Sequence, residues 1–140
     1  MKQLIIVRHA QAHSIDEGFY HDRYRTLTTK GVKQAQQIWL DLQKKEIKPD
    51  IIVTSHAPRA YQTALWIANE LCFDYHNIHT YSESYQWNTD IRSTIIGYYK
   101  EYNSLLICGH NPELLLLCQQ YDHTITELKK WEYKILSIKE

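Results

Sequence analysis

The 140-residue chain has no excess of charge of either sign, no paired-cysteine motif and no long hydrophobic run. Its 16 lysine and arginine residues balance 16 aspartate and glutamate residues. Proteins that bind nucleic acids or anionic membranes usually carry a basic excess, so this balance argues against both functions. No apolar stretch approaches the roughly 20 residues that span a bilayer, and the N-terminus has no signal-peptide pattern. We therefore expect a cytoplasmic protein that binds neither nucleic acid nor membrane.

The three cysteines, Cys72, Cys108 and Cys118, form no CxxC motif and leave one thiol over in any disulfide scheme. Each lies in an apolar run, which favours buried thiols in a reducing compartment. At this length we expect a single domain, residues 1–140, whose core is large enough to fold without disulfides or structural metals.

Motifs that hold nucleotides or magnesium are also missing. The chain contains no P-loop, no GxGxxG and no group of aspartates suited to magnesium. His76 and His79 form an HxxH pattern, but the surrounding stretch offers no third ligand. We therefore expect no metal site and no cofactor.

The sequence does contain a regular alternation of strand-like and helix-like segments. Short apolar runs predict strands, and apolar residues at helical spacing predict amphipathic helices between them. The expected strands cover residues 3–7, 51–53, 77–81, 104–108 and 131–138. The expected helices run from an N-cap at Thr28 to about Glu46, from Pro58 to Leu71, from a cap at Asn88 to Tyr102, and from Glu113 to Gln120. This order predicts a three-layer α/β/α sandwich with a mainly parallel central sheet and the last strand at an edge.

Polar residues gather directly after the expected strands. The residues concerned are Arg8 and His9 after the first strand, Arg59 at the start of the helix that follows the second, Glu83 after the weak third strand, and His110 after the fourth. Ligands of open α/β sheets bind beyond the carboxyl ends of the strands. We therefore expect these side chains to meet at one end of the sheet.

This set of side chains predicts a particular chemistry. Arginine forks match the paired oxygens of a phosphoryl group, and a helix N-terminus adds N–H donors for an anion. A histidine among cationic groups has its charged form disfavoured, so His9 is expected to be neutral and nucleophilic near pH 7. Glu83 can protonate the leaving group. The pattern predicts metal-free phosphoryl transfer through a covalent phosphohistidine.

Four stretches together resemble the histidine phosphatase superfamily: "VRHAQA" from Val7, "RTLTTKG" from Arg25, "SHAPRAYQTA" from Ser55 and "CGHNP" from Cys108. The short chain and the Arg-His-Ala opening most resemble the compact branch, the SixA-type phosphohistidine phosphatases. The resemblance covers residues 3 to about 121 and implies a phosphoglycerate mutase-like fold.

The resemblance also implies a role for each residue of the central cluster. His9 attacks phosphorus, and Arg8 and Arg59 hold the phosphate oxygens. His110 donates to the phosphoryl oxygens and stabilises the charge that develops in the transition state.

Four further residues receive roles from the same resemblance. Asn111 contacts phosphate through its backbone N–H or its amide, and Arg25 contacts substrate from the rim of the pocket. Glu83 is the best-placed carboxylate for acid–base catalysis. Gly31 permits close packing of the first helix.

The sequence departs from the family pattern in ways that bear on its substrate. Ala10 replaces a glycine that is common after the Arg-His pair, and His56 stands where the family usually has proline. Mutases and bisphosphatases of the superfamily carry insertions that wall their pockets, and no large insertion follows the first or the weak third strand here. An open pocket favours a protein-borne substrate, so we expect a phosphatase that acts on protein phosphohistidine. The alternatives are a broad small-molecule phosphomonoesterase of the same family and a non-catalytic module that binds phosphate or phosphopeptides.

Overall fold

The computed structural model describes residues 2–18, 21–70, 73–81, 97–98 and 100–138. The strands are β1 (Lys2–Arg8), β2 (Ile51–Ser55), β3 (Ile78–Tyr81), β4 (Ser104–Gly109) and β5 (Tyr133–Ile138). The α-helices are α1 (Thr29–Lys44), α2 (Pro58–Glu70) and α4 (Glu113–Tyr121). Short 3-10 turns are η1 (Ile15–Glu17), η2 (Asp22–Tyr24) and η3 (Tyr75–Asn77).

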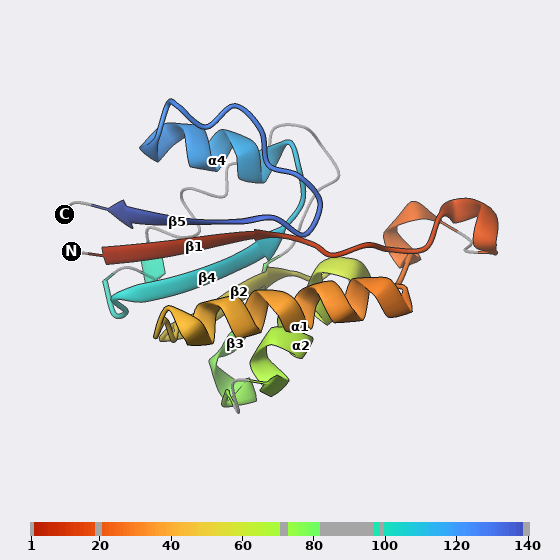
Figure 1. Cartoon of the computed structure of the whole chain (residues 1–140), viewed down its shortest axis with the longest axis horizontal. Coiled ribbons are helices and arrows are strands. Elements are labelled where there is room, and N and C mark those ends of the chain that lie inside the picture. Colours follow the sequence, from red (N-terminus) through yellow and green to blue (C-terminus); the bar gives the residue numbers. More distant parts are fainter. Residues whose placement is uncertain (1, 19–20, 71–72, 82–96, 99, 139–140) are drawn as a thin grey trace.

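The strands form one sheet in the order β3-β2-β4-β1-β5. The first four strands of this order are parallel, and β5 pairs antiparallel with β1 at an edge. Helices α1 and α2 cover one face and α4 covers the other, which gives three layers (Figure 1). This confirms the predicted α/β sandwich with a mainly parallel sheet. The carboxyl ends of β1, β2 and β4 lie together, toward the right of Figure 1.

Strand β1 is buried on both faces, which explains its uninterrupted apolar run. Ile5 and Val7 pack against α1 and α2, whereas Leu4 and Ile6 pack on the side of α4. All four side chains are fully buried, and each such burial contributes roughly 1.5–3 kcal/mol to the stability of the fold. The strand therefore holds Arg8, its last residue, in a fixed place.

The loop that leaves β1 is fastened to the two helices on that face. Thr28 caps α1 as predicted, because its Oγ1 accepts from the Gly31 N–H at 3.0 Å. A side chain at Gly31 would clash with the carbonyl oxygen of Gln11, so glycine allows the loop to lie against α1. The Ala10 N–H donates to Thr63 Oγ1 of α2 at 3.0 Å. The backbone just after His9 is thus held from two sides.

Several element boundaries differ from the prediction by one or two residues, and two of these differences have a visible cause in the backbone. Helix α1 ends at Lys44, because Glu46 has a φ of 56° and cannot continue the helix. Strand β5 begins at Tyr133, because Trp131 has a φ of 54° and its N–H donates to the His9 carbonyl at 3.3 Å. The helix predicted from Asn88 to Tyr102 lies mostly outside the described residues.

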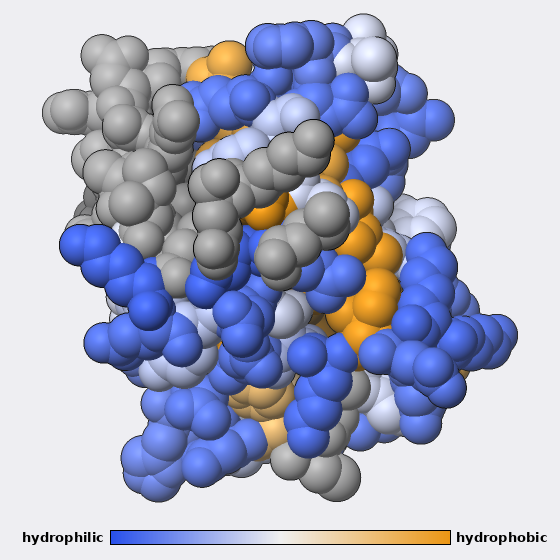
Figure 2. All heavy atoms as spheres, turned by 90° about the vertical axis from the view of Figure 1, so that its left-hand side faces the viewer, coloured by the Kyte–Doolittle hydropathy of each residue, from blue (hydrophilic) through white to orange (hydrophobic). Residues whose placement is uncertain are grey.

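Hydrophilic side chains cover most of the described surface seen in Figure 2, and hydrophobic ones lie in narrow bands between them. Cys108 and Cys118 are buried as predicted, and burial raises the pKa of the Cys118 thiol to about 11. Cys72 lies outside the described residues. Within the part of the chain that the structure describes, no helix is both long and apolar enough to cross a bilayer.

Candidate active site

The pairing of β1 with β4 brings the Arg-His pair beside the Gly-His pair. Arg8 ends β1 and lies in register with Gly109, which ends β4. The His9 N–H donates to the Gly109 carbonyl at 3.0 Å, so His9 and His110 leave the sheet as neighbours. Their ring centroids are 5.2 Å apart and their planes are inclined by 57°.

Arg59 reaches the same end of the sheet from the other neighbour of β4. Strand β2 ends at Ser55, and α2 begins only three residues later, at Pro58. Arg59, the second residue of that helix, is buried, and its charge acts on His9. The structure therefore brings Arg8, His9, Arg59 and His110 together from three separate segments.

His9 is held in a neutral state with one ring nitrogen unprotonated. The side chain is buried, and Nδ1 lies 2.8 Å from the carbonyl oxygen of Ala10. A carbonyl only accepts hydrogen bonds, so Nδ1 carries the proton and Nε2 keeps its lone pair. Burial lowers the pKa of His9 to about 3, with further lowering from the charges of His110, Arg59 and Arg8 and some opposition from the Ala10 hydrogen bond.

A buried hydroxyl orients His110. Its Nε2 lies 3.1 Å from Ser55 Oγ, which also accepts from the Ala57 N–H at 3.1 Å. Ser55 and His110 are both buried. Ser55 was not among the predicted site residues, although a small polar residue just after the apolar run at residues 51–53 was an available signal.

The guanidinium groups of buried Arg59 and half-buried Arg8 each have an Nε donor with no described partner. Arg8 donates from Nη1 to the Leu128 carbonyl at 2.9 Å, and Arg59 donates from Nη1 to the Asp22 carbonyl at 3.1 Å. The Nε atoms of both arginines are buried without a hydrogen-bond partner among the described residues. A buried unpaired donor costs about 1–3 kcal/mol, and more when charged. Two such donors near His9 suit an anion with several oxygens, such as a phosphoryl group.

Arg25, predicted at the rim, is linked to Arg59 through one carboxylate. Its Nε donates to Asp22 Oδ1 at 2.8 Å, and its Nη1 donates to the His13 carbonyl at 2.8 Å. Asp22 also accepts from Arg59 Nη2 through Oδ2 at 3.3 Å. Asp22 was not among the predicted site residues. Its position three residues before Arg25 allows the ion pair, but nothing local in the sequence indicates the contact with Arg59.

Asn111 uses its amide nitrogen within the protein. Nδ2 donates to the Leu128 carbonyl at 2.8 Å, and this is the carbonyl that also accepts from Arg8. Leu128 lies beyond the stretch that resembles the family, and its carbonyl orients two of the predicted residues. A backbone carbonyl leaves no signature in a sequence, so this contact could not be predicted.

Two predictions remain to be compared with the structure: the role of Glu83 and the expectation that there is no metal site. Glu83 lies outside the described residues, so its role stays a prediction. Among the residues that are described, no group of three or more His, Cys, Asp or Glu side chains is arranged to hold a metal ion. His76 pairs with Asp74 at 3.0 Å, and His79 Nδ1 lies 3.2 Å from Tyr98 Oη.

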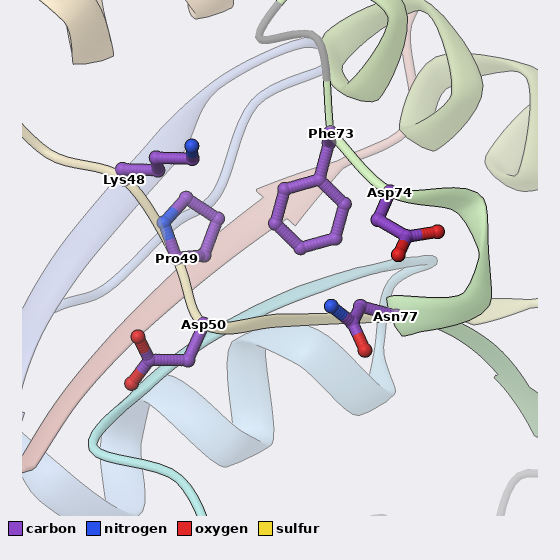
Figure 3. A pocket seen from close by; sticks show the side chains of 6 residues that line it. All are labelled: Lys48, Pro49, Asp50, Phe73, Asp74 and Asn77. Carbon is purple, nitrogen blue, oxygen red and sulfur yellow. The ribbon is translucent and has the colours of Figure 1, made fainter.

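The pocket shown in Figure 3 lies at the opposite end of the sheet, just before β2 and β3. It encloses about 360 Å³. Its lining consists of Lys48, Pro49, Asp50, Phe73, Asp74 and Asn77. It contains no predicted site residue, and the candidate active site is therefore the cluster around His9.

One known protein is similar in sequence to about half of this chain. The chain is 40% identical over 72 residues to "Putative phosphoserine phosphatase 2" of Hydrogenobacter thermophilus. The match covers 51% of this chain and 34% of the relative, so it spans about a third of the length of that protein.

Solved structures share the fold over nearly the whole chain. The "putative phosphohistidine phosphatase SixA" of Agrobacterium tumefaciens has a TM-score of 0.76 at 20% identity, and the match covers 96% of this chain and 90% of that one. The alpha-ribazole phosphatase of Shigella flexneri has a TM-score of 0.74 at 16% identity, with 99% and 91% covered.

The family model described as histidine phosphatase superfamily (branch 1) matches residues 4–84, which include Arg8, His9 and Arg59. This range is more than half of the 140-residue chain. The protein therefore belongs to the histidine phosphatase superfamily, branch 1.

Proposed function

We propose that this protein is a metal-independent phosphatase that works through a covalent phosphohistidine at His9. Membership of the superfamily supports phosphatase activity. The observation that carries the mechanism is the state of His9: Nδ1 is bound to the Ala10 carbonyl, and the ring is neutral beside two arginines and a second histidine. Such a ring presents an unprotonated Nε2 to an anion that the neighbouring cations attract.

In the first step, Nε2 of His9 attacks phosphorus in line with the leaving group. A nitrogen–phosphorus bond forms while the bond to the leaving group breaks, and the leaving group departs with its electron pair and takes up a proton. Arg8, Arg59 and His110 neutralise the three equatorial oxygens. These three groups are the charges that act on His9 in the folded protein.

In the second step, water attacks the phosphorus of phospho-His9, and the nitrogen–phosphorus bond breaks. Inorganic phosphate leaves and the neutral His9 is restored. Glu83 is proposed as the group that passes protons to the leaving group and from the water. Arg25 is proposed as a contact to the substrate at the rim, and Asn111 as a donor to phosphate through its backbone N–H.

The proposed substrate is phosphohistidine on a protein. The motifs resemble the compact SixA-type branch, and a SixA protein is among the structures with the same fold. A protonated phosphohistidine ring is a good leaving group, so little further acid catalysis is needed. A broad small-molecule phosphomonoesterase is the second candidate. Its support is the similarity of the chain to proteins named as a phosphoserine phosphatase and an alpha-ribazole phosphatase.

Phosphoenzyme trapping tests the mechanism. Brief incubation with a ³²P-labelled phosphohistidine protein should label the enzyme in an acid-labile, alkali-stable form, and His9→Ala should abolish both label and turnover with little change in thermal stability. A fully active His9→Ala variant would overturn the mechanism. Tight phosphate binding without label or turnover would instead identify a non-catalytic binding module.

Comparing two substrates identifies the substrate class. The same enzyme preparation is assayed with a phosphohistidine protein and with para-nitrophenyl phosphate. A higher kcat/KM for the phosphoprotein supports the proposed substrate, whereas a preference for the small ester supports the phosphomonoesterase.

The proposal further includes one domain over residues 1–140 and a cytoplasmic location.

A further inference from the structure

A negative charge lies among the cations of the described site, and it belongs to Asp22 in η2. Its backbone carbonyl and its Oδ2 accept from Nη1 and Nη2 of Arg59, at 3.1 and 3.3 Å. Its Oδ1 accepts from Nε of Arg25 at 2.8 Å. The Arg59 side chain is 6% exposed, whereas that of Asp22 is 45% exposed. Asp22 therefore approaches the buried arginine from the solvent side.

The contacts of Asp22 use one particular edge of the Arg59 guanidinium. A guanidinium carries five N–H donors in a rigid planar fork. Asp22 takes one donor from each terminal nitrogen, and the buried Nε has no partner among the described residues. Nε and the remaining hydrogen of the adjacent Nη form a second fork, which can bind two oxygens of one phosphoryl group.

We propose that Asp22 is a positioning residue, which holds Arg59 by its terminal nitrogens so that the Nε edge faces the phosphoryl group bound at His9. This inference rests on the proposed phosphatase function. Asp22 acts through Arg59 and does not touch the substrate. Its second bond, to Arg25, places the rim arginine in the same rigid unit, since Arg25 Nη1 is itself held by the His13 carbonyl.

The negative charge of Asp22 means that this residue cannot assist the reaction by attracting the phosphate anion. The charges of Arg59 and Arg25 outweigh burial and lower the pKa of Asp22, so the carboxylate is ionised at neutral pH. An ionised carboxylate near the site repels a phosphate anion. Asp22 is therefore expected to weaken the binding of phosphate while improving the geometry of the transition state. Loss of the charge should separate these two effects.

The test is Asp22→Asn, which keeps the shape of the side chain and the backbone contact but removes the charge. The control is Asp16→Asn, which removes an exposed acid from η1 in the same loop. With a phosphohistidine protein as substrate, kcat should fall about 10- to 100-fold, the loss expected when a reacting group is misplaced by about 1 Å. The inhibition constant of inorganic phosphate should stay unchanged or decrease, and the control should match the wild type.

A double-mutant cycle tests whether the effect passes through Arg59. Lysine in Arg59→Lys keeps the charge but has no second fork to present. In that background, Asp22→Asn should change kcat by less than about threefold, because the group it positions is gone. A full additional loss in the double variant would show that Asp22 acts by another route and would overturn the inference.

Two further outcomes contradict the inference. One is an unchanged kcat in Asp22→Asn, and the other is a phosphate inhibition constant that rises as kcat falls, which would indicate a loosened loop. If Asp22→Asn does not fold, Asp22→Glu carries the same test, since it keeps the charge but displaces it and should lower kcat to a smaller extent. Wild-type protein that forms no phosphoenzyme refutes the proposed function itself. Wild-type turnover with an unaffected Asp22→Asn refutes only the role of Asp22.

Discussion

The buried imidazole of His9 makes the stability of the protein depend on pH in a calculable direction. Burial and the neighbouring positive charges lower its pKa from the usual 6.5 to about 3. Between these two values the unfolded chain binds a proton at His9 that the folded protein does not bind. The contribution of His9 is therefore favourable above pH 6.5 and is lost as the pH falls toward 3. The change is about 1.4 kcal/mol per pH unit, which amounts to about 2 kcal/mol between pH 7 and pH 5.

Urea unfolding at pH 7 and pH 5 measures this contribution. The wild type is compared with His9→Gln, which replaces the imidazole by a side chain that does not titrate, in buffers without phosphate because an anion at the site would stabilise charged His9. From pH 7 to pH 5 the wild type should lose about 2 kcal/mol more free energy of unfolding than the variant. His56→Gln, at an exposed position, is the control and should behave as the wild type does.

Parallel loss of stability in the wild type and in His9→Gln would refute the reasoning. It would mean that the folded protein binds the proton at His9 as readily as the unfolded chain does. The neutral nucleophile, on which the proposed mechanism depends, would then have no physical basis.

Three further perturbations give separate predictions. Gly31→Ala should destabilise the protein by about 1–3 kcal/mol, seen as a lower Tm, because the new methyl group meets the Gln11 carbonyl; an unchanged Tm would contradict the close packing. Ser55→Ala should lower kcat about tenfold with an unchanged circular dichroism spectrum, because His110 loses the hydroxyl that orients it; wild-type kcat would show that the contact is incidental. Addition of EDTA should leave turnover unchanged, because the proposed groups are all protein side chains; inhibition that zinc reverses would restore the metal interpretation.

Much of the fold could be predicted because its elements depend on local patterns. Strands β1, β2 and β4 are buried on both faces of the sheet, so each contains a short continuous apolar run. The apolar residues of α1 and α2 recur with the helical period. The cap at Thr28 depends on a side chain and a backbone group three residues apart. Two of the boundaries that shifted lie near Glu46 and Trp131, residues of types that usually avoid positive φ but adopt it here, so nothing in the sequence indicated them.

The candidate site divides in the same way between local and distant information. The amino-acid types at Arg8, His9, Arg59 and His110 and their places after strands were enough to predict a phosphoryl-transfer site. The groups that orient them were not predictable. Asp22 lies 37 residues from Arg59, and Leu128 lies 120 residues from Arg8. No local pattern encodes a contact at that separation.

The sequence by itself determined which segments become strands and helices, and which reactive side chains stand where those strands end. Only the tertiary structure decided that β1 lies beside β4, which makes His9 and His110 neighbours, and that Ser55, Asp22 and the Leu128 carbonyl hold the reactive groups in place. The physical reason is that periodicity and capping act over a few residues. Strand order and the partners of a buried cation follow instead from how the whole chain packs.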